Sequence, residues 1–491
     1  MTKLRLKKEP RLDARLEAFA YQTEAVNAIR DLEYAAIFHE QGLGKSKIAI
    51  DLMLQWLENK TIDTVLFIVK KGLIHNWERE LSTHTFMKPK LITQNRRSNY
   101  YAFNSPSRLM LSHFEVINSE LDRFKLFLKA RDVAVIVDEA AKIKNPESTL
   151  TQSFFELAPL FKKRIIMTGT PVANRPYDIW AQIWFLDQGQ SLGNDFSKFK
   201  HDADMANELA VDVARREKFE NTTESIFRRI SNFAVRETKN SGVIELPQKV
   251  IKTIRTDWEK NQYNLYRLVK EEMRAAIIKE GVPTEDNAEP ILKRMLRLVQ
   301  IASNPNLIDE SYKSSPGKLD TLEEIVSDIS QKGEKCIIWS SFTENVDWLC
   351  AHLSHFGSCK VHGKIDIERR NISINKFLSD PHTTILVATP QAAKEGLTLT
   401  VANHVIFYDR TFSLDDYLQA QDRIHRISQT KTCFVYNLVM TDSIDEWVDV
   451  LLKSKHLAAQ LAQGDISIEY YRSQISYEFG TIIRNILGIT H

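Results

Sequence analysis

The stretch at residues 34–58 constrains the fold of this chain more than any other. It reads YAAIFHEQGLGKSKIAIDLMLQWLE, a short apolar run followed by a glycine-containing turn and a segment with helical spacing. Gly42 and Gly44 let the backbone approach an anion closely, and the N-terminus of the following helix presents N–H groups and the positive end of its dipole. Lys45 and Ser46 add a cation and a hydroxyl. The stretch therefore predicts a cradle for the phosphates of a nucleoside triphosphate such as ATP, together with Mg²⁺.

The match covers the core Gly-Leu-Gly-Lys-Ser, in which Leu43 lies between the two glycines, and not the whole phosphate-loop pattern. The full pattern begins with a glycine, and this chain has His39 at that position. An incidental Gly-Lys-Ser sequence at the start of a helix is the alternative when this stretch is taken alone.

Length, charge and cysteine content narrow the class of protein. A chain of 491 residues exceeds what a single core usually supports, so we expect two or three domains. The net charge of +2 means that any surface for nucleic acid must be a local groove. The four cysteines show neither zinc-ligand nor disulfide spacing, which favours reduced thiols and no zinc site. The basic N-terminal residues lack the apolar core of a signal peptide, and no stretch is apolar enough to span a bilayer. We expect a cytoplasmic protein, associated with the nucleoid if the source is prokaryotic.

Apolar runs rich in β-branched residues recur on both sides of a long helical region. Residues 64–69, 132–138 and 164–168 form such runs in the first part, as expected for strands that are buried on both faces of a parallel sheet. Residues 177–315 show mostly helical periodicity. After a break at residues 314–317 the strand pattern restarts, at residues 335–339, 383–388, 404–408 and 433–437. The alternation of strands and helices predicts an α/β class with two sheet domains.

Two carboxylates follow the apolar run at residues 132–138. Asp138 and Glu139 come at the carboxyl end of this predicted strand, which is the usual position for ligand-binding groups in open α/β sheets. Asp138 suits a Mg²⁺ ion, and Glu139 suits the polarisation of an attacking water. An acidic turn without function is the alternative reading of this pair alone.

Two further stretches suggest contacts with phosphate. Residues 167–174, MTGTPVAN, combine a strand end with hydroxyls and a glycine that suit a phosphodiester backbone or a nucleotide sensor, although a plain turn is the alternative. Residues 419–429 place Arg423 and Arg426 one helical turn apart, and we expect them to point the same way. Two guanidinium groups suit the charge on a transferring phosphoryl group, and a solvated basic face is the alternative.

These four stretches, in this order, resemble the Swi/Snf-related ATPases, the chromatin-remodeller branch of the superfamily-two helicases and translocases. The resemblance extends over nearly the whole chain, in a compact form without accessory reader domains. Further segments that resemble the motifs of this family are Gln22 after Tyr21, Val69–Trp77 with Glu80, Ile143–Asn145, Phe233–Arg236, Leu246–Lys249, Val299–Pro305, Lys318, Trp339–Phe342, Val361–Gly363 with Arg370, and Glu395–Leu399 with Ala402.

The resemblance implies two RecA-like lobes with parallel sheets and helical insertions between the core motifs, with ATP bound between the lobes and duplex DNA across both. The expected organisation is an N-terminal lobe at residues 1–240 with an insertion at about 185–230, a linker and insertion at 241–315, a C-terminal lobe at 316–470 and a helical tail at 471–491.

The resemblance also implies roles for individual residues. Lys45 would neutralise the β- and γ-phosphates, Glu139 would be the general base, and Arg423 and Arg426 would be arginine fingers. Ser46 and Asp138 would hold Mg²⁺. The expected nucleotide-binding residues are Gln22, which would read adenine, Gly42, Leu43, Gly44, Lys45, Ser46, Asp138, Glu139 and Gly396. The expected contacts with the nucleic-acid backbone are Lys70, Lys71, Ser112, His113, Thr170, Asn174, His362, Lys364 and Thr389.

The chain departs from the pattern of this family at several positions. Ala141 stands where the family has a histidine that would link the nucleotide site to the turn at residues 168–171, and a methyl group cannot make that hydrogen bond. Ala393 and Lys394 replace two glycines, and Ser428 replaces another. These changes indicate either a divergent branch of the family or a loss of coupling between ATP hydrolysis and nucleic acid.

The sequence thus predicts an ATP-dependent translocase on double-stranded DNA, acting as a monomer without a membrane partner. One alternative is a helicase that unwinds DNA or RNA. A second is a nucleic-acid clamp that is gated by ATP and only weakly coupled to its hydrolysis.

Overall fold

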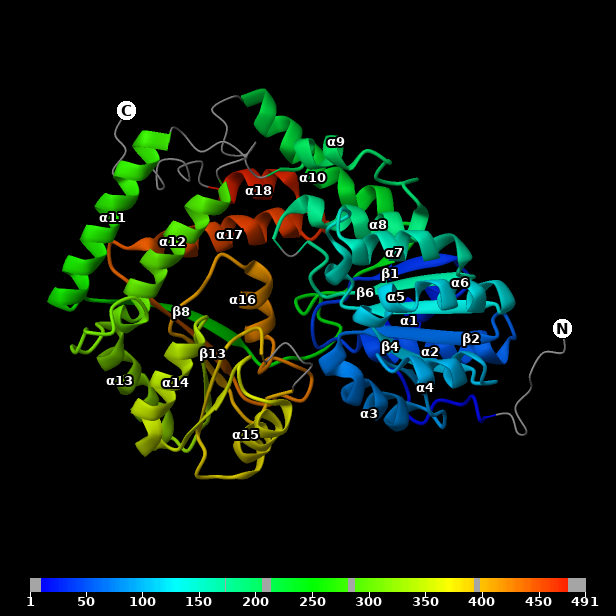
Figure 1. Cartoon of the computed structure of the whole chain (residues 1–491), viewed down its shortest axis with the longest axis horizontal. Coiled ribbons are helices and arrows are strands. Elements are labelled where there is room, and N and C mark those ends of the chain that lie inside the picture. Colours follow the sequence, from blue (N-terminus) through cyan, green and yellow to red (C-terminus); the bar gives the residue numbers. More distant parts are fainter. Residues whose placement is uncertain (1–9, 173, 205–212, 281–287, 393–397, 476–491) are drawn as a thin grey trace. The chain divides into compact units, whose positions relative to one another are not determined.

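The computed structural model describes residues 10–172, 174–204, 213–280, 288–392 and 398–475, with the backbone alone for residues 273–280 and 288–294. The chain forms two compact units, each shown with its elements in Figure 1. Unit 1 consists of Met1–Ile244 and Ala458–Ser473, and unit 2 consists of Glu245–Leu457 and Gln474–His491.

Unit 1 contains a seven-stranded sheet in the order β3-β4-β2-β5-β6-β1-β7, and all its strand pairs are parallel. Its central strands are almost wholly buried, because a parallel sheet is covered by helices on both faces. The strands are β1 (Tyr34–Ile37), β2 (Thr64–Val69), β3 (Lys90–Ile92), β4 (Leu109–His113), β5 (Val133–Asp138), β6 (Lys163–Met167) and β7 (Ala234–Val235).

Helices cover both faces of this sheet. On one face, Val65, Phe67 and Val69 share an apolar core with side chains of α1, α2 and α3. Leu66 and Ile68, which point to the other face, are equally buried, and α8 contacts β1 and β6 there. The helices of unit 1 are α1 (Ala20–Ile29), α2 (Lys45–Glu58), α3 (Ile74–His84), α4 (Arg96–Phe103), α5 (Phe114–Ser119), α6 (Leu121–Ala130), α7 (Thr149–Leu157), α8 (Trp180–Asp187), α9 (Phe196–Asp202) and α10 (Val213–Ile230).

The returning segment Ala458–Ser473 is tied to the rest of unit 1 by two ion pairs. Arg236, which follows β7, donates hydrogen bonds from its guanidinium to both carboxylate oxygens of Asp465. Arg472 pairs with the buried Glu220 of α10 at 2.7 Å. Partly buried ion pairs of this kind are screened less by salt than exposed ones, so they fix this segment on unit 1.

Unit 2 contains a six-stranded parallel sheet in the order β10-β11-β9-β12-β13-β8. Apolar side chains from alternate strand positions form two cores, one on each face. The strands are β8 (Lys249–Thr256), β9 (Cys336–Trp339), β10 (Ser358–Val361), β11 (Ile385–Ala388), β12 (His404–Phe407) and β13 (Cys433–Met440). The helices are α11 (Lys260–Glu280), α12 (Ala288–Ser303), α13 (Lys318–Gln331), α14 (Thr343–His352), α15 (Ile367–Ser379) and α16 (Leu414–Gln421). Helix α17 (Ile444–Ala462) begins in unit 2 and ends in the returning segment of unit 1, which also contains all but the last residue of α18 (Ile468–Gln474).

The predicted α/β class with two parallel sheets is confirmed, and β2 has the predicted bounds. The main strand that the sequence did not reveal is β8, which lies in the region expected to be mostly helical. It pairs along its whole length with β13, from Lys249 opposite Cys433 to Thr256 opposite Met440. Because β8 is an edge strand and half-exposed, it lacks the continuous apolar run that marks a central strand. Most of the expected tail, residues 476–491, lies outside the described residues.

Candidate functional site

Three neighbouring strands of unit 1 bring the predicted nucleotide-binding stretches to one edge of the sheet. In the order β5-β6-β1, the last residues Asp138, Met167 and Ile37 lie side by side, since Met167 pairs with both of the others. Carboxyl ends of parallel strands meet at the same edge, where open α/β sheets bind their ligands. The cradle, the Thr-Gly-Thr turn and the acidic pair therefore follow three adjacent strands.

The cradle has the backbone that a phosphate site needs. Gly42 and Gly44 have φ values of 87° and 70°, which favour glycine, and α2 begins directly after Gly44. Gly44 has no side chain to cap this helix N-terminus, and a helix N-terminus attracts anions through its N–H groups and dipole. A Cβ atom at Gly44 would lie 2.2 Å from Nε2 of Gln22. Glycine at this position is thus required by conformation and by space.

Gln22 and Tyr21 of α1 support the cradle from beside it. The Tyr21 hydroxyl donates to the carbonyl of Leu43 at 3.1 Å, and Nε2 of Gln22 lies 3.5 Å from the same oxygen. The Gln22 side-chain oxygen accepts a hydrogen bond from the N–H of Phe19 at 3.0 Å. Gln22 therefore lies at the cradle, while its roles in binding the nucleotide and reading adenine stay predictions.

Lys45 lies over the turn that precedes it. Its ammonium donates to the backbone carbonyls of His39 and Glu40, at 3.0 and 3.2 Å. The His39 side chain is buried, and this burial together with the nearby Lys45 ammonium lowers the pKa of His39 to about 4. At neutral pH the imidazole is uncharged, so Lys45 supplies the positive charge of the turn.

Asp138 occupies an environment that favours a bound cation. Its carboxylate accepts hydrogen bonds from the indole N–H of Trp77 at 2.8 Å and from the N–H of Glu139 at 2.9 Å. Burial at the end of β5 and the neighbouring Glu139 carboxylate raise the pKa of Asp138 to about 6, against the opposing effects of Trp77, Lys45 and Lys70. A divalent cation would offset the repulsion between the two carboxylates.

The donor set fits Mg²⁺ in particular. Ser46 in the first turn of α2 and Asp138 offer oxygen ligands. Among the described residues, no three or more His, Cys, Asp and Glu side chains gather into a metal-binding group. Oxygen donors of this kind suit Mg²⁺, which takes most of its ligands from phosphate and water, and the assignment of Ser46 and Asp138 to this ion stays a prediction.

Glu139 is held in an unusual conformation. Its φ of 55° and ψ of 52° place a non-glycine residue in the left-handed region, which costs energy and is most often found at functional sites. The Gln41 amide donates to one carboxylate oxygen at 3.3 Å, and the Lys70 ammonium lies 3.9 Å from the other. Lys70, expected to contact nucleic acid, thus forms an ion pair with the candidate general base.

The other nucleic-acid candidates of unit 1 differ in exposure. Ser112 is fully buried and donates its hydroxyl hydrogen to the carbonyl of Ile92, so phosphates have no access to it in this conformation. His113 is buried beside Glu115 at 2.8 Å, and Thr170 is buried in the turn after β6. Lys71 is exposed and Asn174 is half-exposed. Exposure therefore favours Lys71 as a phosphate contact in this set.

The candidates of unit 2 are largely engaged by acidic side chains or buried. His362 is buried, and its Nε2 atom lies 3.1 Å from the Asp347 carboxylate. Lys364 is exposed and pairs with Glu344. Thr389 is buried. Gly396, Ala393 and Lys394 lie outside the described residues.

Arg423 and Arg426 belong to unit 2, and the prediction that they share a helical face is wrong. Helix α16 ends at Gln421, and both arginines lie in the turns that follow. The Gln429 amide donates to the carbonyls of Ile424 and Ala402, which holds this segment in a turn instead of a helix. Arg423 is buried, whereas Arg426 is half-exposed.

Two hydrogen bonds fix the Arg426 side chain. Its Nε atom donates to the carbonyl of Asp422 and one terminal nitrogen donates to the Thr398 hydroxyl, both at 2.9 Å. The guanidinium is therefore held in one orientation at the surface of unit 2. Its role as an arginine finger stays a prediction.

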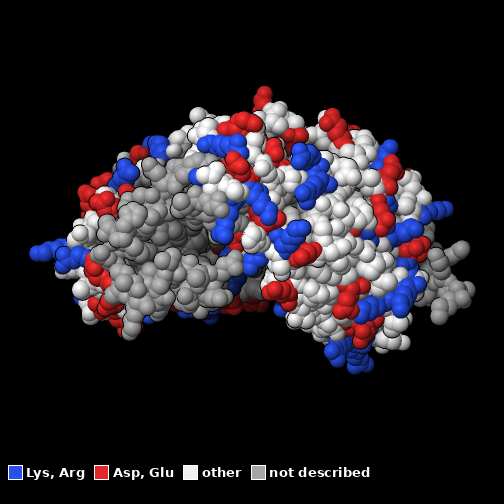
Figure 2. Space-filling view, turned by 90° about the horizontal axis from the view of Figure 1, so that it is seen from above, with Lys and Arg blue, Asp and Glu red and all other residues white. Residues whose placement is uncertain are grey.

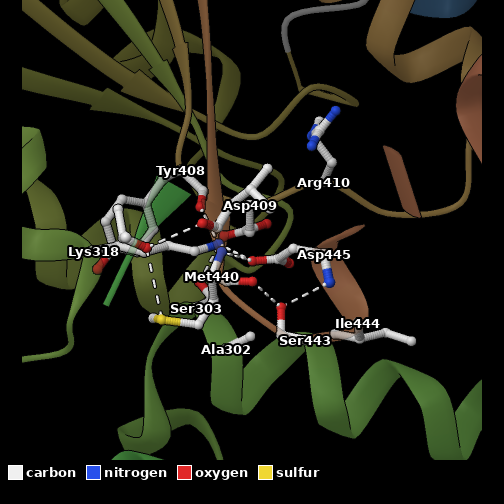
Figure 3. A network of polar contacts seen from close by, with 12 residues as sticks. Ala302, Ser303, Lys318, Tyr408, Asp409, Arg410, Met440, Ser443, Ile444 and Asp445 are labelled. Atoms are coloured by element: carbon white, nitrogen blue, oxygen red, sulfur yellow. Dashed lines mark hydrogen bonds and ion pairs between the residues drawn. The ribbon is translucent and has the colours of Figure 1, made fainter. Parts of the chain in front are cut away.

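A buried polar network fills the carboxyl edge of the sheet of unit 2 (Figure 3). The Lys318 side chain is fully buried, pairs with Asp445 at 2.6 Å and donates to the carbonyl of Tyr408 at 2.9 Å. Asp409 accepts hydrogen bonds from the hydroxyls of Ser303 and Ser340, at 2.8 and 2.6 Å. The sequence pointed to Lys318 through the family resemblance but neither to its partner Asp445 nor to Asp409. The position of Asp409 just after a strand, like that of Asp138, is the signal that could have revealed it.

The surface agrees with a nearly neutral chain. On the face shown in Figure 2, Lys and Arg side chains are interspersed with Asp and Glu. In the part of the chain that the structure describes, no helix has both the length and the apolar character to cross a bilayer.

Two family models together match most of the chain. Residues 21–307 match the SNF2-related domain, and residues 317–428 match the helicase conserved C-terminal domain. An uncharacterized ATP-dependent helicase of Mycoplasma genitalium is 28% identical over 439 residues, which cover 87% of this chain and 40% of the relative. The ISWI chromatin-remodeling complex ATPase ISW1 of Saccharomyces cerevisiae is 25% identical over 452 residues, covering 87% of this chain and 39% of the relative.

A solved structure, the SWI2/SNF2 ATPase core of Sulfolobus solfataricus in complex with double-stranded DNA, aligns with 96% of this chain and 99% of that chain, at 24% identity and a TM-score of 0.43. The chain spans less than half the length of the two relatives above. The match to the SNF2-related domain alone extends over more than half of this chain. The chain therefore belongs to the SNF2-related family of ATP-hydrolysing enzymes.

Proposed function

We propose that this chain is an ATP-dependent translocase on double-stranded DNA, which moves along the duplex or remodels protein–DNA complexes. The observation that carries the proposal is the convergence of the glycine cradle and the Asp138–Glu139 pair on one edge of the sheet of unit 1. A duplex substrate is supported by family membership and by a relative named as a chromatin-remodeling ATPase.

In this proposal the groups at the sheet edge divide the chemistry among them. Lys45 contacts the β- and γ-phosphates, for which its ammonium already lies at the cradle. Ser46 and Asp138 hold Mg²⁺, which neutralises charge on the phosphates when bound. Glu139 accepts the proton of the attacking water. Its carboxylate is oriented for this by Gln41 and Lys70.

Groups outside the cradle complete the proposal. Arg423 and Arg426 supply positive charge to the transferring phosphoryl group, an interaction that strengthens as the transition state forms. The exposed lysines Lys71 and Lys364 contact phosphates of the duplex. Such contacts hold the backbone without reading sequence, as a motor that moves along DNA requires.

An ATPase titration tests the proposal. The full chain is assayed with duplex DNA, single-stranded DNA and RNA of equal length at one ionic strength, because affinity for nucleic acid depends steeply on salt. We expect duplex DNA to stimulate ATP turnover the most. In a second assay, displacement of the third strand from a DNA triplex should show movement along an intact duplex.

Other outcomes support the alternatives. Equal stimulation by single strands, with opening of a forked duplex, would show an unwinding helicase. Tight nucleotide-dependent binding to DNA without stimulated turnover would show the clamp, an alternative that Ala141 motivates because its methyl group makes no hydrogen bond.

A further inference from the structure

We propose that Gln41 is a positioning residue for Glu139 and connects this candidate base to the turn at residues 168–170. This inference rests on the proposed role of Glu139 in hydrolysis. Gln41 lies in the loop between β1 and α2, and its amide donates to Oε1 of Glu139 at 3.3 Å across 98 residues of sequence. Hydrogen bonds at catalytic sites are often long before substrate binds and shorten in the reacting complex.

The sheet order explains why Gln41 contacts three loops. Strand β6 lies between β1 and β5, so a side chain from the β1 loop must pass over the loop after β6 to reach Glu139. Gly169 is the residue that it passes. A Cβ atom at position 169 would lie 2.8 Å from Cγ and 3.1 Å from Cδ of Gln41. These distances are shorter than van der Waals contact, so the absence of a side chain at residue 169 is what makes room for Gln41.

The chemistry of the contact suits a general base. A general base must present its oxygen in one direction, and the hydrogen bond from the Gln41 amide fixes the direction of that oxygen. The Lys70 ammonium is 3.9 Å from the other carboxylate oxygen. The Glu139 backbone is in the left-handed region, so side-chain contacts must hold the residue against its conformational preference.

Because Gln41 contacts both groups, a movement of the turn at residues 168–170 also moves Glu139. Thr168 and Thr170 flank Gly169, and the Thr168 hydroxyl accepts a hydrogen bond from the N–H of Thr170 at 3.2 Å, so the turn moves as a unit. Any displacement of this turn displaces Gln41, which fills the space above Gly169. Position 141 is an alanine and makes no side-chain hydrogen bond, whereas the Gln41 side chain contacts both the turn and Glu139.

The test compares Gln41→Met with wild type in the full chain. Methionine keeps the length and packing of the side chain over Gly169 but lacks the amide. We expect kcat to fall about 10- to 100-fold, the range for a hydrogen bond to a charged group, with the KM and the Kd for ATP unchanged. The melting temperature should match wild type. Gln94→Met, at an exposed glutamine, is the matched control and should leave both kinetic constants unchanged.

Two further variants strengthen the test. Gln41→Glu is isosteric but places a like charge beside Glu139, so its kcat should be lower than that of Gln41→Met. Gly169→Ala should lower kcat by displacing Gln41, and the double variant with Gln41→Met should lose less than the product of the two separate losses, because both changes break the same amide contact. Gly169→Ala alone replaces the first variant if Gln41→Met fails to fold.

Recovery of kcat in a double variant provides a readout that cannot be explained by a loss of packing. Ala141→His in the Gln41→Met background should recover part of the lost kcat, because imidazole can hydrogen-bond where the methyl group cannot. An unchanged kcat in Gln41→Met, or a rise in KM that accounts for the whole effect, overturns the inference. Retained turnover in Glu139→Gln would instead overturn the proposed base, whereas an inactive Glu139→Gln with normal Gln41→Met defeats only the positioning role.

Discussion

The carboxyl edges of the two sheets carry polar groups at equivalent places but use them differently. In unit 1 the loops after β1, β6 and β5 carry the cradle, the Thr-Gly-Thr turn and the acidic pair. In unit 2 the adjacent strands β9, β12 and β13 are followed by Ser340, Asp409 and Asp445, which bond to one another or to Lys318. The first edge carries the groups that we propose for ATP. The polar groups of the second edge form hydrogen bonds and an ion pair with one another.

Electrostatics explains this difference. Unit 1 places two carboxylates next to each other, and burial together with their repulsion raises the pKa of Asp138, so a bound cation would stabilise this edge. Unit 2 places the fully buried Lys318 against Asp445, and Asp409 accepts several hydrogen bonds (Figure 3). Buried charges are tolerated when they are paired and hydrogen-bonded. The comparison teaches that the same strand ends build a site in one unit and a structural brace in the other.

The strongest test of the first edge is Glu139→Gln. The amide cannot accept the proton of water, and we expect turnover to fall by about 10²- to 10⁴-fold, the typical contribution of a general base. ATP binding and the free energy of unfolding should stay close to wild type, since the residue serves a ligand and not the fold. A steady-state ATPase assay with a nucleotide-binding titration measures both. Glu156→Gln, at an exposed partner of Lys125, is the control and should be fully active.

The corresponding test of the second edge is Lys318→Met. Removing the ammonium leaves Asp445 buried without its partner, which typically costs about 3–5 kcal/mol of unfolding free energy. Denaturant unfolding measures the loss. Lys332→Met removes an exposed partner of Asp328 and should cost less than about 1 kcal/mol. Equal losses in both variants would contradict the view that the Lys318 network holds unit 2 together.

The pH dependence of the unfolding free energy tests the environment of His39, which lies beside the cradle. Burial and Lys45 lower the pKa of His39 to about 4, from an ordinary value near 6.5, so the unfolded chain binds the proton more tightly. The stability that neutral His39 provides is present above pH 6.5 and is lost as the pH falls towards 4. The difference in unfolding free energy between wild type and His39→Gln should therefore change by about 2 kcal/mol between pH 7 and pH 4.5.

Denaturant unfolding at a series of pH values measures this change. His75→Gln, which removes a histidine with a 93% exposed side chain, provides the control. A pH-independent difference for His39→Gln would show that the imidazole is not held neutral against the Lys45 ammonium.

The sequence was a sound guide to features that depend on neighbours along the chain. The central strands β2 and β5 were predicted because strands buried on both faces are continuously apolar. The cradle was predicted because its glycines and the helix start are consecutive. Edge strand β8 was missed because half of its surface meets solvent.

Contacts between distant residues could not be predicted from the sequence. Gln41 meets Glu139 only after the sheet of unit 1 has brought the ends of β1 and β5 to one edge, on either side of β6. Lys318 likewise meets Asp445 only after the sheet of unit 2 has formed. The helical spacing of Arg423 and Arg426 was misleading, because the hydrogen bonds of Gln429 hold that segment in a turn. Side-chain pairing across the sheet thus decides which polar residues serve a ligand and which serve the fold.

The smallest predicted effect concerns contacts with nucleic acid and compares an exposed side chain with a buried one. Lys71 is exposed after β2, whereas the Ser112 hydroxyl is buried and donates to Ile92. Lys71→Ala should weaken duplex binding slightly and reduce the slope of log K against log salt by about 1, as expected for one lost phosphate contact. Ser112→Ala should leave both the affinity and the slope unchanged. Fluorescence anisotropy over a salt series measures these quantities. A lower salt slope in Ser112→Ala would mean that its strand end opens when DNA binds, so that this edge serves two ligands.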